Sequence, residues 1–115
     1  MSDVLPARGE VWVVDLNPIR GHEQAGLRPA LILSDDTFNH GPADLVVVVP
    51  MTRTDRRIPL HVEVSPPEGG LKTRSFVMCE MLRSITKSRL RKRWGRLSEP
   101  KLAAVEERVR ILLGL

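Results

Sequence analysis

The chain has 115 residues, which is enough for one compact domain and too few for two. Residues 1–115 are therefore predicted to form a single domain. Hydrophobic side chains make up 42% of the residues and aromatic ones only 3%, so a core must be built from Val, Leu and Ile.

Two features predict where the protein resides. The longest apolar run, residues 45–49, is far shorter than the roughly 20 residues that span a bilayer, and the N-terminus lacks the apolar stretch of a signal peptide. Cys79 is the single cysteine, which excludes an internal disulfide and suits a reducing compartment. We expect a cytoplasmic protein without membrane association.

Charge is distributed unevenly along the chain. Residues 1–51 hold three Arg against seven acids, whereas residues 52–115 hold fifteen Lys or Arg against seven acids. Seven of the fourteen side chains in residues 83–96 are cationic and none is acidic. Such a block indicates a polyanionic partner, either nucleic acid or an acidic peptide, with a solvated basic face as the alternative.

The first half of the chain predicts three strands. Residues 10–16 are rich in β-branched and apolar side chains and stop at the turn signal Asn17-Pro18. A polar, glycine-bearing loop follows, then a second strand over residues 29–34 and a connection, residues 35–42, with room for a helical turn. Residues 45–49 predict a central strand buried on both faces, which Pro50 should end because proline cannot donate to a sheet ladder.

The second half predicts further strands and one helix. Residues 60–64 alternate apolar and polar side chains, as a half-exposed strand does, and residues 75–79, 81–85 and 91–97 have strand character. Trp94 is expected to point inward. Ser98 should cap a helix whose apolar positions share one face: Leu102, Val105, Val109, Leu112 and Leu113. This order predicts a mainly β fold with a C-terminal helix, a small curved sheet or barrel.

The loop before the second strand contains the first candidate for chemistry. Glu23 and Arg28 are five residues apart, across a glycine that lets the backbone turn, and Pro29 biases Arg28 toward extended structure. An Arg held in this way can direct its planar guanidinium at a phosphate. A surface Arg–Glu pair is the alternative interpretation.

The second candidate follows the buried strand, where Thr52 precedes Arg53. A hydroxyl beside a guanidinium could hydrogen-bond a phosphate oxygen and stabilise charge that develops in a transition state. The alternative is a strand-end Thr that bonds to its own backbone.

Other chemistries are less well supported. His22, His40 and His61 lack the spacing of a metal site, so neither a metal nor a cofactor is expected. Cys79 lies in an apolar strand and is expected to be a core residue rather than a nucleophile. The residues alone therefore predict a basic, β-rich domain that binds an anionic polymer.

Two sequence motifs resemble those of a known family. The run RGEVWVVDLNP at residues 8–18 and the run GHEQAGLRPALIL at residues 21–33 look like the opening of MazF/PemK-family toxins, the mRNA interferases of type II toxin–antitoxin systems. The similarity continues through residues 49–52 and 80–85 into the closing helix. It covers nearly the whole chain from Arg8.

The resemblance implies a fold, an activity and partners. The fold would be an SH3-like small barrel of the CcdB/PemK-like plasmid-maintenance toxin type, assembled as a homodimer with RNA bound across the interface. The activity would be metal-independent, sequence-specific endoribonuclease cleavage of single-stranded RNA. The ribose 2′-hydroxyl would be the nucleophile, and the products would be 2′,3′-cyclic phosphate and 5′-hydroxyl ends. A cognate acidic antitoxin would inhibit the enzyme.

The resemblance also assigns residues. The family's catalytic Arg and Thr match Arg28 and Thr52, and Glu23 matches a loop carboxylate that would transfer a proton or position the Arg. RNA-binding positions are matched by His22, Gln24, Arg53, Ser75, Glu80 and Met81. In many relatives the position of Met81 is Gln, so a hydrogen-bonding amide is missing here. The 17–27 loop has no aromatic residue, which limits base stacking there.

Two alternatives stay open at this stage. One is a DNA-gyrase poison, because the related CcdB toxins share the barrel, although their aromatic C-terminus contrasts with the sequence ILLGL here. The other is a non-catalytic SH3-like module that binds RNA or a peptide.

Overall fold

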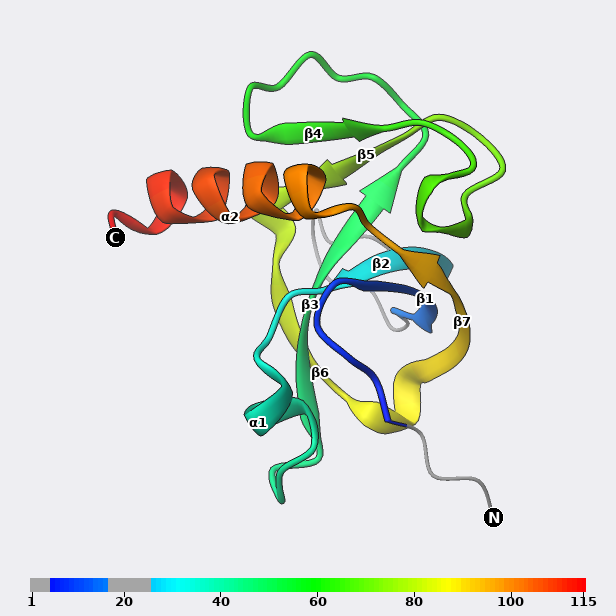
Figure 1. Ribbon diagram of the computed structural model, residues 1–115, viewed down its shortest axis with the longest axis vertical. Coiled ribbons are helices and arrows are strands. Elements are labelled where there is room, and N and C mark those ends of the chain that lie inside the picture. The colour runs from blue at the N-terminus through cyan, green and yellow to red at the C-terminus, as the bar shows by residue number, and fades with distance from the viewer. Residues whose placement is uncertain (1–4, 17–25) are drawn as a thin grey trace.

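The computed structural model describes residues 5–16 and 26–115 (Figure 1). The strands are β1 (Glu10–Asp15), β2 (Leu27–Ile32), β3 (Leu45–Thr52), β4 (His61–Val64), β5 (Ser75–Met78), β6 (Arg83–Thr86) and β7 (Leu90–Arg96). The helices are α1 (Asp36–Asn39) and α2 (Glu99–Leu113), and three 3-10 turns are η1 (Glu68–Gly70), η2 (Cys79–Met81) and η3 (Lys87–Arg89). None of the helices in this part of the chain is long and apolar enough to cross a membrane.

All seven described strands join one antiparallel sheet. The strand order is β4-β5-β3-β2-β1-β7, and β6 pairs with β3 beside this path. The beginning of β3 pairs with β6 at residues 45–48, whereas its end pairs with β5 at Met51 and Thr52. The long β3 therefore crosses the molecule and connects the part that contains β6 with the part that contains β4 and β5 (Figure 1). The predicted mainly β fold with a C-terminal helix is confirmed.

Two apolar clusters cover opposite faces of the central strands. Val11, Leu31 and Val49, on β1, β2 and β3, belong to one core, which the α2 residue Val105 also joins. The residues next to them in the chain, Trp12, Ala30 and Val48, belong to the other. Because successive strand residues point to opposite faces, β3 is buried on both sides from Val48 to Thr52, as predicted for a central strand, whereas Leu45 and Val47 are half-buried.

Pro50 does not end β3, contrary to the sequence prediction. The strand continues to Thr52, with Pro50 opposite Ala30 of β2. Pro50 lies between Val48, the last residue that pairs with β6, and Met51, the first that pairs with β5. The ladder on that edge is already interrupted there, so a proline without an N–H group can be accommodated.

Helix α2 begins and ends as expected for a capped helix. The Ser98 side chain accepts a hydrogen bond from the Lys101 N–H, which confirms the predicted cap, and Gly114 ends the helix in the left-handed conformation at φ 72°. Val105 is fully buried, and Leu102 and Val109 pack against the same core. The predicted apolar face is wrong for the last turn, where Leu113 is 53% exposed because the helix extends beyond the sheet (Figure 1).

Trp94 does not point into the core, and an irregularity of β7 explains why. Val11 of β1 pairs with Gly95 and the next residue, Trp12, pairs with Arg93, so Trp94 is an extra residue at a shift of register. Such a bulge redirects a side chain away from the face that simple alternation predicts. Trp94 is 37% exposed, whereas Trp12 is 8% exposed.

Glycines allow another segment to approach this bulge closely. Gly70 of η1 has φ 72°, and a Cβ added there would lie 2.1 Å from the carbonyl oxygen of Trp94. A Cβ on Gly95 would lie 2.6 Å from the carbonyl carbon of Gly69. The backbones of η1 and β7 therefore touch, and only residues without a side chain fit at this crossing.

We expect Gly70→Ala to destabilise the fold by about 2–4 kcal/mol, because it adds a backbone clash to the strain of a positive φ. Gly114→Ala is the matched control. It has the same φ of 72° but no atom within 4 Å of the added Cβ, so its cost should be about 1 kcal/mol. Urea unfolding of both variants measures the difference, and equal costs would show that the close approach is not rigid.

Candidate functional site

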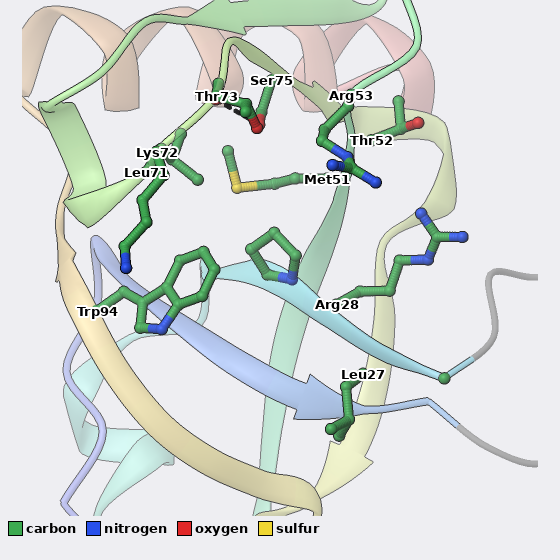
Figure 2. A pocket seen from close by; sticks show the side chains of 12 residues that line it. Leu27, Arg28, Met51, Thr52, Arg53, Leu71, Lys72, Thr73, Ser75 and Trp94 are labelled. Atoms are coloured by element: carbon green, nitrogen blue, oxygen red, sulfur yellow. Dashed lines mark hydrogen bonds between the residues drawn. The ribbon is translucent and has the colours of Figure 1, made fainter.

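A pocket of about 480 Å³ opens where β2 and β3 separate. We call it the β2–β3 pocket, and it is lined by Gly26, Leu27, Arg28, Pro29, Met51, Thr52, Arg53, Leu71, Lys72, Thr73, Ser75 and Trp94 (Figure 2). The last residues that pair between the two strands are Ala30 and Pro50. Beyond this pair β3 turns to β5, and the space that it leaves is the pocket.

The register of the sheet relates the two predicted catalytic residues. Ala30 lies opposite Pro50, Leu31 opposite Val49 and Ile32 opposite Val48. Arg28 and Thr52 each lie two residues beyond the Ala30–Pro50 pair, and both line the pocket that opens there. The pair therefore stands at neighbouring strand ends, although 23 residues separate the two positions in the chain. The structure brings together what the sequence predicted as separate elements.

Thr52 is buried, and its hydroxyl already accepts one hydrogen bond. Thr52 is 5% exposed, and its Oγ1 accepts a hydrogen bond from the Thr54 N–H at 3.2 Å. This is the backbone-bonding role that the sequence left as an alternative. A hydroxyl that accepts one bond keeps its own hydrogen to donate, so the local bond orients Thr52 and does not remove it from chemistry.

The described residues that line the β2–β3 pocket include three cations and no acid. Figure 2 shows Arg28, Thr52 and Arg53 at one side of the pocket and Lys72 at the opposite side. Ser75 is buried, and its hydroxyl donates to the Thr73 carbonyl at 3.0 Å. This hydrogen bond holds the part of the pocket wall that Thr73 and Ser75 form. A cavity with this charge and these donors suits an anion with several oxygen atoms.

Two of the predicted RNA-binding residues, Glu80 and Met81, do not line the pocket. The predicted catalytic Glu23 and the predicted RNA-binding His22 and Gln24 fall outside the described residues. Glu80 and Met81 form the turn η2. Glu80 Oε2 instead lies 2.8 Å from Nε2 of His61. This contact explains why His61 is buried, although the alternation of residues 60–64 predicted an exposed polar face.

The basic block of residues 83–96 is less available than the sequence indicated. Arg93 Nε donates to Glu10 at 2.6 Å, and Arg91 lies 3.1 Å from the Asp15 carboxylate. The acids come from β1, the antiparallel neighbour of β7, so they are distant in sequence and adjacent in space. Glu10 also accepts from the Trp12 indole N–H at 3.0 Å. Part of the positive charge of β7 therefore holds the sheet together.

Cys79 has the role that was predicted for it. It is fully buried in the core, and burial raises the pKa of its thiol to about 11. A thiol with this pKa is protonated at neutral pH and is a poor nucleophile. Within residues 5–16 and 26–115, no three His, Cys, Asp or Glu side chains form a group that could hold a metal ion.

Sequence reasoning missed one wall of the pocket. Trp94, Lys72, Leu71 and Thr73 line it, and none of them was a candidate. Lys72 and Thr73 follow η1, which reaches the pocket only because its glycines let it lie against β7. Three glycines at residues 69, 70 and 95 were the available signal, because such residues often mark a close approach of two backbones.

Comparison with known proteins gives consistent matches. A family model described as PemK-like, MazF-like toxin of type II toxin–antitoxin system matches residues 7–113. The endoribonuclease MazF of Staphylococcus saprophyticus is 35% identical over 109 residues, which cover 94% of this chain and 91% of the relative.

Solved structures agree with the sequence matches. The crystal structure of MazF from Deinococcus radiodurans has a TM-score of 0.86 and 29% identity, and the match covers 98% of this chain and 100% of that one. A MazE–MazF structure from the same organism has a TM-score of 0.80 at 30% identity, covering 98% and 99%. An endoribonuclease in complex with its cognate antitoxin, from a mycobacterial species, has a TM-score of 0.80 at 27% identity, covering 96% of each chain.

Proposed function

Because the chain belongs to the PemK-like, MazF-like toxins of type II toxin–antitoxin systems, we propose that it is an endoribonuclease whose active site is the β2–β3 pocket. The resemblance noted in the sequence is thereby confirmed at the level of the family. One observation carries the assignment of the site: Arg28 and Thr52, from two neighbouring strands, line one pocket whose described residues include no acid. The single domain of residues 1–115 would hold the whole activity.

The proposed reaction is transesterification within the RNA. The ribose 2′-oxygen attacks the adjacent phosphorus, its proton passes to a base, and the bond from phosphorus to the 5′-oxygen breaks as that oxygen gains a proton. The products are a 2′,3′-cyclic phosphate and a 5′-hydroxyl. RNA supplies its own nucleophile, so the protein must orient the reacting atoms and stabilise the charge of the pentacoordinate phosphorane.

Arg28 and Thr52 divide the charge stabilisation between them. The planar guanidinium of Arg28 can donate two parallel hydrogen bonds to phosphate oxygens, and the Thr52 hydroxyl can donate one from a fixed position. Arg53 adds positive charge beside them. These donors act most strongly in the transition state, because negative charge on the phosphate oxygens is greatest there.

Proton transfer needs a further group. Within the described residues that line the pocket there is neither a carboxylate nor an imidazole. Glu23, five residues before Arg28, stays our candidate for accepting the proton of the 2′-hydroxyl or for positioning Arg28. We assign contacts with flanking nucleotides to His22, Gln24, Ser75, Glu80 and Met81.

The proposed partners follow from charge and from the family. The solved relatives include an endoribonuclease bound to its cognate antitoxin, and we propose that an acidic, partly disordered antitoxin inhibits this chain by occupying the pocket. We also propose that the toxin is a homodimer that binds single-stranded RNA across its interface. Its place of action would be the cytoplasm.

Cleavage of single-stranded RNA should persist in excess EDTA, because the mechanism needs no metal ion. The measurement is cleavage of a long transcript with and without EDTA, followed by mapping of the 2′,3′-cyclic phosphate ends. DNA-gyrase supercoiling is assayed in parallel. Loss of cleavage that Mg²⁺ or Zn²⁺ restores would exclude this chemistry, and gyrase inhibition without RNA cleavage would favour the CcdB-like alternative.

Arg28→Ala should lower the cleavage rate by on the order of 10²–10⁴-fold, the usual cost of losing a positioned charge stabiliser or proton donor. Arg28→Lys should recover little, because an ammonium cannot make the bidentate contact. Arg56→Ala is the matched control: Arg56 is exposed in the loop after β3 and does not line the pocket. Similar losses in the Arg28→Ala and Arg56→Ala variants would move the chemistry elsewhere.

RNA and the antitoxin should exclude each other, because both would bind the same cationic pocket. The assay is displacement of a fluorescent single-stranded DNA of the cleaved sequence, which lacks the 2′-hydroxyl and is not cut, by the purified antitoxin. Full displacement is expected, together with loss of cleavage. A ternary complex that still cleaves RNA would contradict this account of inhibition.

A further inference from the structure

Trp94 places an aromatic side chain in the β2–β3 pocket, whereas the 17–27 loop has none. We propose that the Trp94 indole is the surface on which one unpaired base of the RNA stacks, and that this contact gives a modest nucleotide preference at one position near the cleaved bond. The inference rests on the proposed endoribonuclease function and adds a specificity-determining residue to it.

The position of Trp94 is determined by the backbone. It is the extra residue at the shift of register between β7 and β1, where Val11 pairs with Gly95 and Trp12 pairs with Arg93. Because of this shift, the Trp94 side chain does not point to the face that regular alternation along β7 would give, and it lines the β2–β3 pocket instead. Of the two tryptophans, Trp12 is in a core and Trp94 is 37% exposed.

The backbone beneath the indole is closely supported. A Cβ on Gly70 would lie 2.1 Å from the Trp94 carbonyl oxygen and 3.1 Å from the Trp94 Cβ, so η1 lies directly against this residue. Leu71, which follows η1, is buried in the core and lines the same wall. An aromatic ring on a fixed backbone loses little conformational freedom when a base stacks on it, which makes it an efficient platform.

The arrangement of the pocket separates a phosphate side from a base side. Figure 2 shows the Trp94 ring across the pocket from the Arg28 guanidinium, with Lys72 on the side of the ring. The volume of about 480 Å³ lies in the range of pockets that hold ligands larger than a phosphate. A nucleotide with its phosphate at Arg28 and Thr52 would therefore have room for its base beside Trp94.

The surroundings of Trp94 favour a nucleotide over an apolar protein side chain. Exposed tryptophans also anchor protein interfaces, but those anchors usually fill apolar pockets. Here the other pocket residues include Arg28, Arg53 and Lys72 as well as hydroxyl groups. Base–aromatic stacking next to cations is the usual arrangement in proteins that bind single-stranded nucleic acid.

The first test is fluorescence of the full-length toxin titrated with the uncleavable single-stranded DNA. Stacking on Trp94 should quench the emission of the wild type. In Trp94→Phe, where only the buried Trp12 emits, quenching should be absent although the DNA still binds. Equal quenching of the two proteins would overturn the proposal, because the signal would then come from Trp12.

The second test compares two replacements of Trp94 in the cleavage assay. Trp94→Phe keeps an aromatic face, whereas Trp94→Leu keeps apolar bulk without one. Loss of stacking should raise KM for RNA by roughly 5- to 150-fold in the Leu variant, with kcat little changed, since stacking is a binding contact. The Phe variant should stay near the wild type. Circular dichroism of both variants checks that the sheet is intact.

Mapping of the cleaved ends completes the test. In Trp94→Leu the nucleotide preference should weaken at one position and stay at the others. Wild-type KM and unchanged preference in the Leu variant would overturn the proposal while the endoribonuclease function stands. Weaker binding of the antitoxin alone, with RNA unaffected, would instead assign Trp94 to the protein interface. Failure of the proposed function is distinct, because the wild type would then not cut RNA at all.

Discussion

After Pro50, β3 stops pairing with β2 and continues as the partner of β5. The candidate site depends on this change. Arg28 and Thr52 both lie beyond the last β2–β3 pair, Ala30 and Pro50, and both line the pocket. The same strand is held rigidly farther back, where Val46 and Val48 are fully buried and pair with β6. The pocket is therefore an opening in a sheet whose remaining part is firmly packed.

The two sides of the pocket arise from two different irregularities of the sheet. The side with Arg28 and Thr52 comes from strands that separate, and the side with Trp94 comes from a bulge against which η1 packs. If β2 and β3 had paired along their whole length, no space would open beside Arg28 and Thr52. If β7 had no bulge, the Trp94 side chain would point inward. The candidate site thus depends on where the ladder of hydrogen bonds is interrupted, and bulges and strand ends are common near active sites.

Much of this architecture could be predicted from local sequence patterns. Residues 10–16, 45–49 and the helix after Ser98 were identified because apolar spacing and capping are local signals. Arg28 and Thr52 were found from motif resemblance, and only the register of β2 and β3 relates them in space. The orientation of Trp94 could not be predicted, because a shift of register depends on the partner strand. The ion pairs of Glu10 and Asp15 with Arg93 and Arg91 of β7 could not be predicted either, because β1 and β7 are far apart in the sequence.

Those acidic partners on β1 have a consequence for how binding should respond to salt. Each phosphate neutralised by a protein cation releases a condensed counterion, and for single strands the slope of log affinity against log salt is about −0.7 per phosphate. The seven cations of residues 83–96 would give a slope of about −5 if all met phosphates. With Arg91 and Arg93 engaged by Asp15 and Glu10, five cations of this block remain, and they would give a slope of about −3.5. Counterion release would then contribute less to affinity than the sequence alone indicates, and shape and stacking would contribute more.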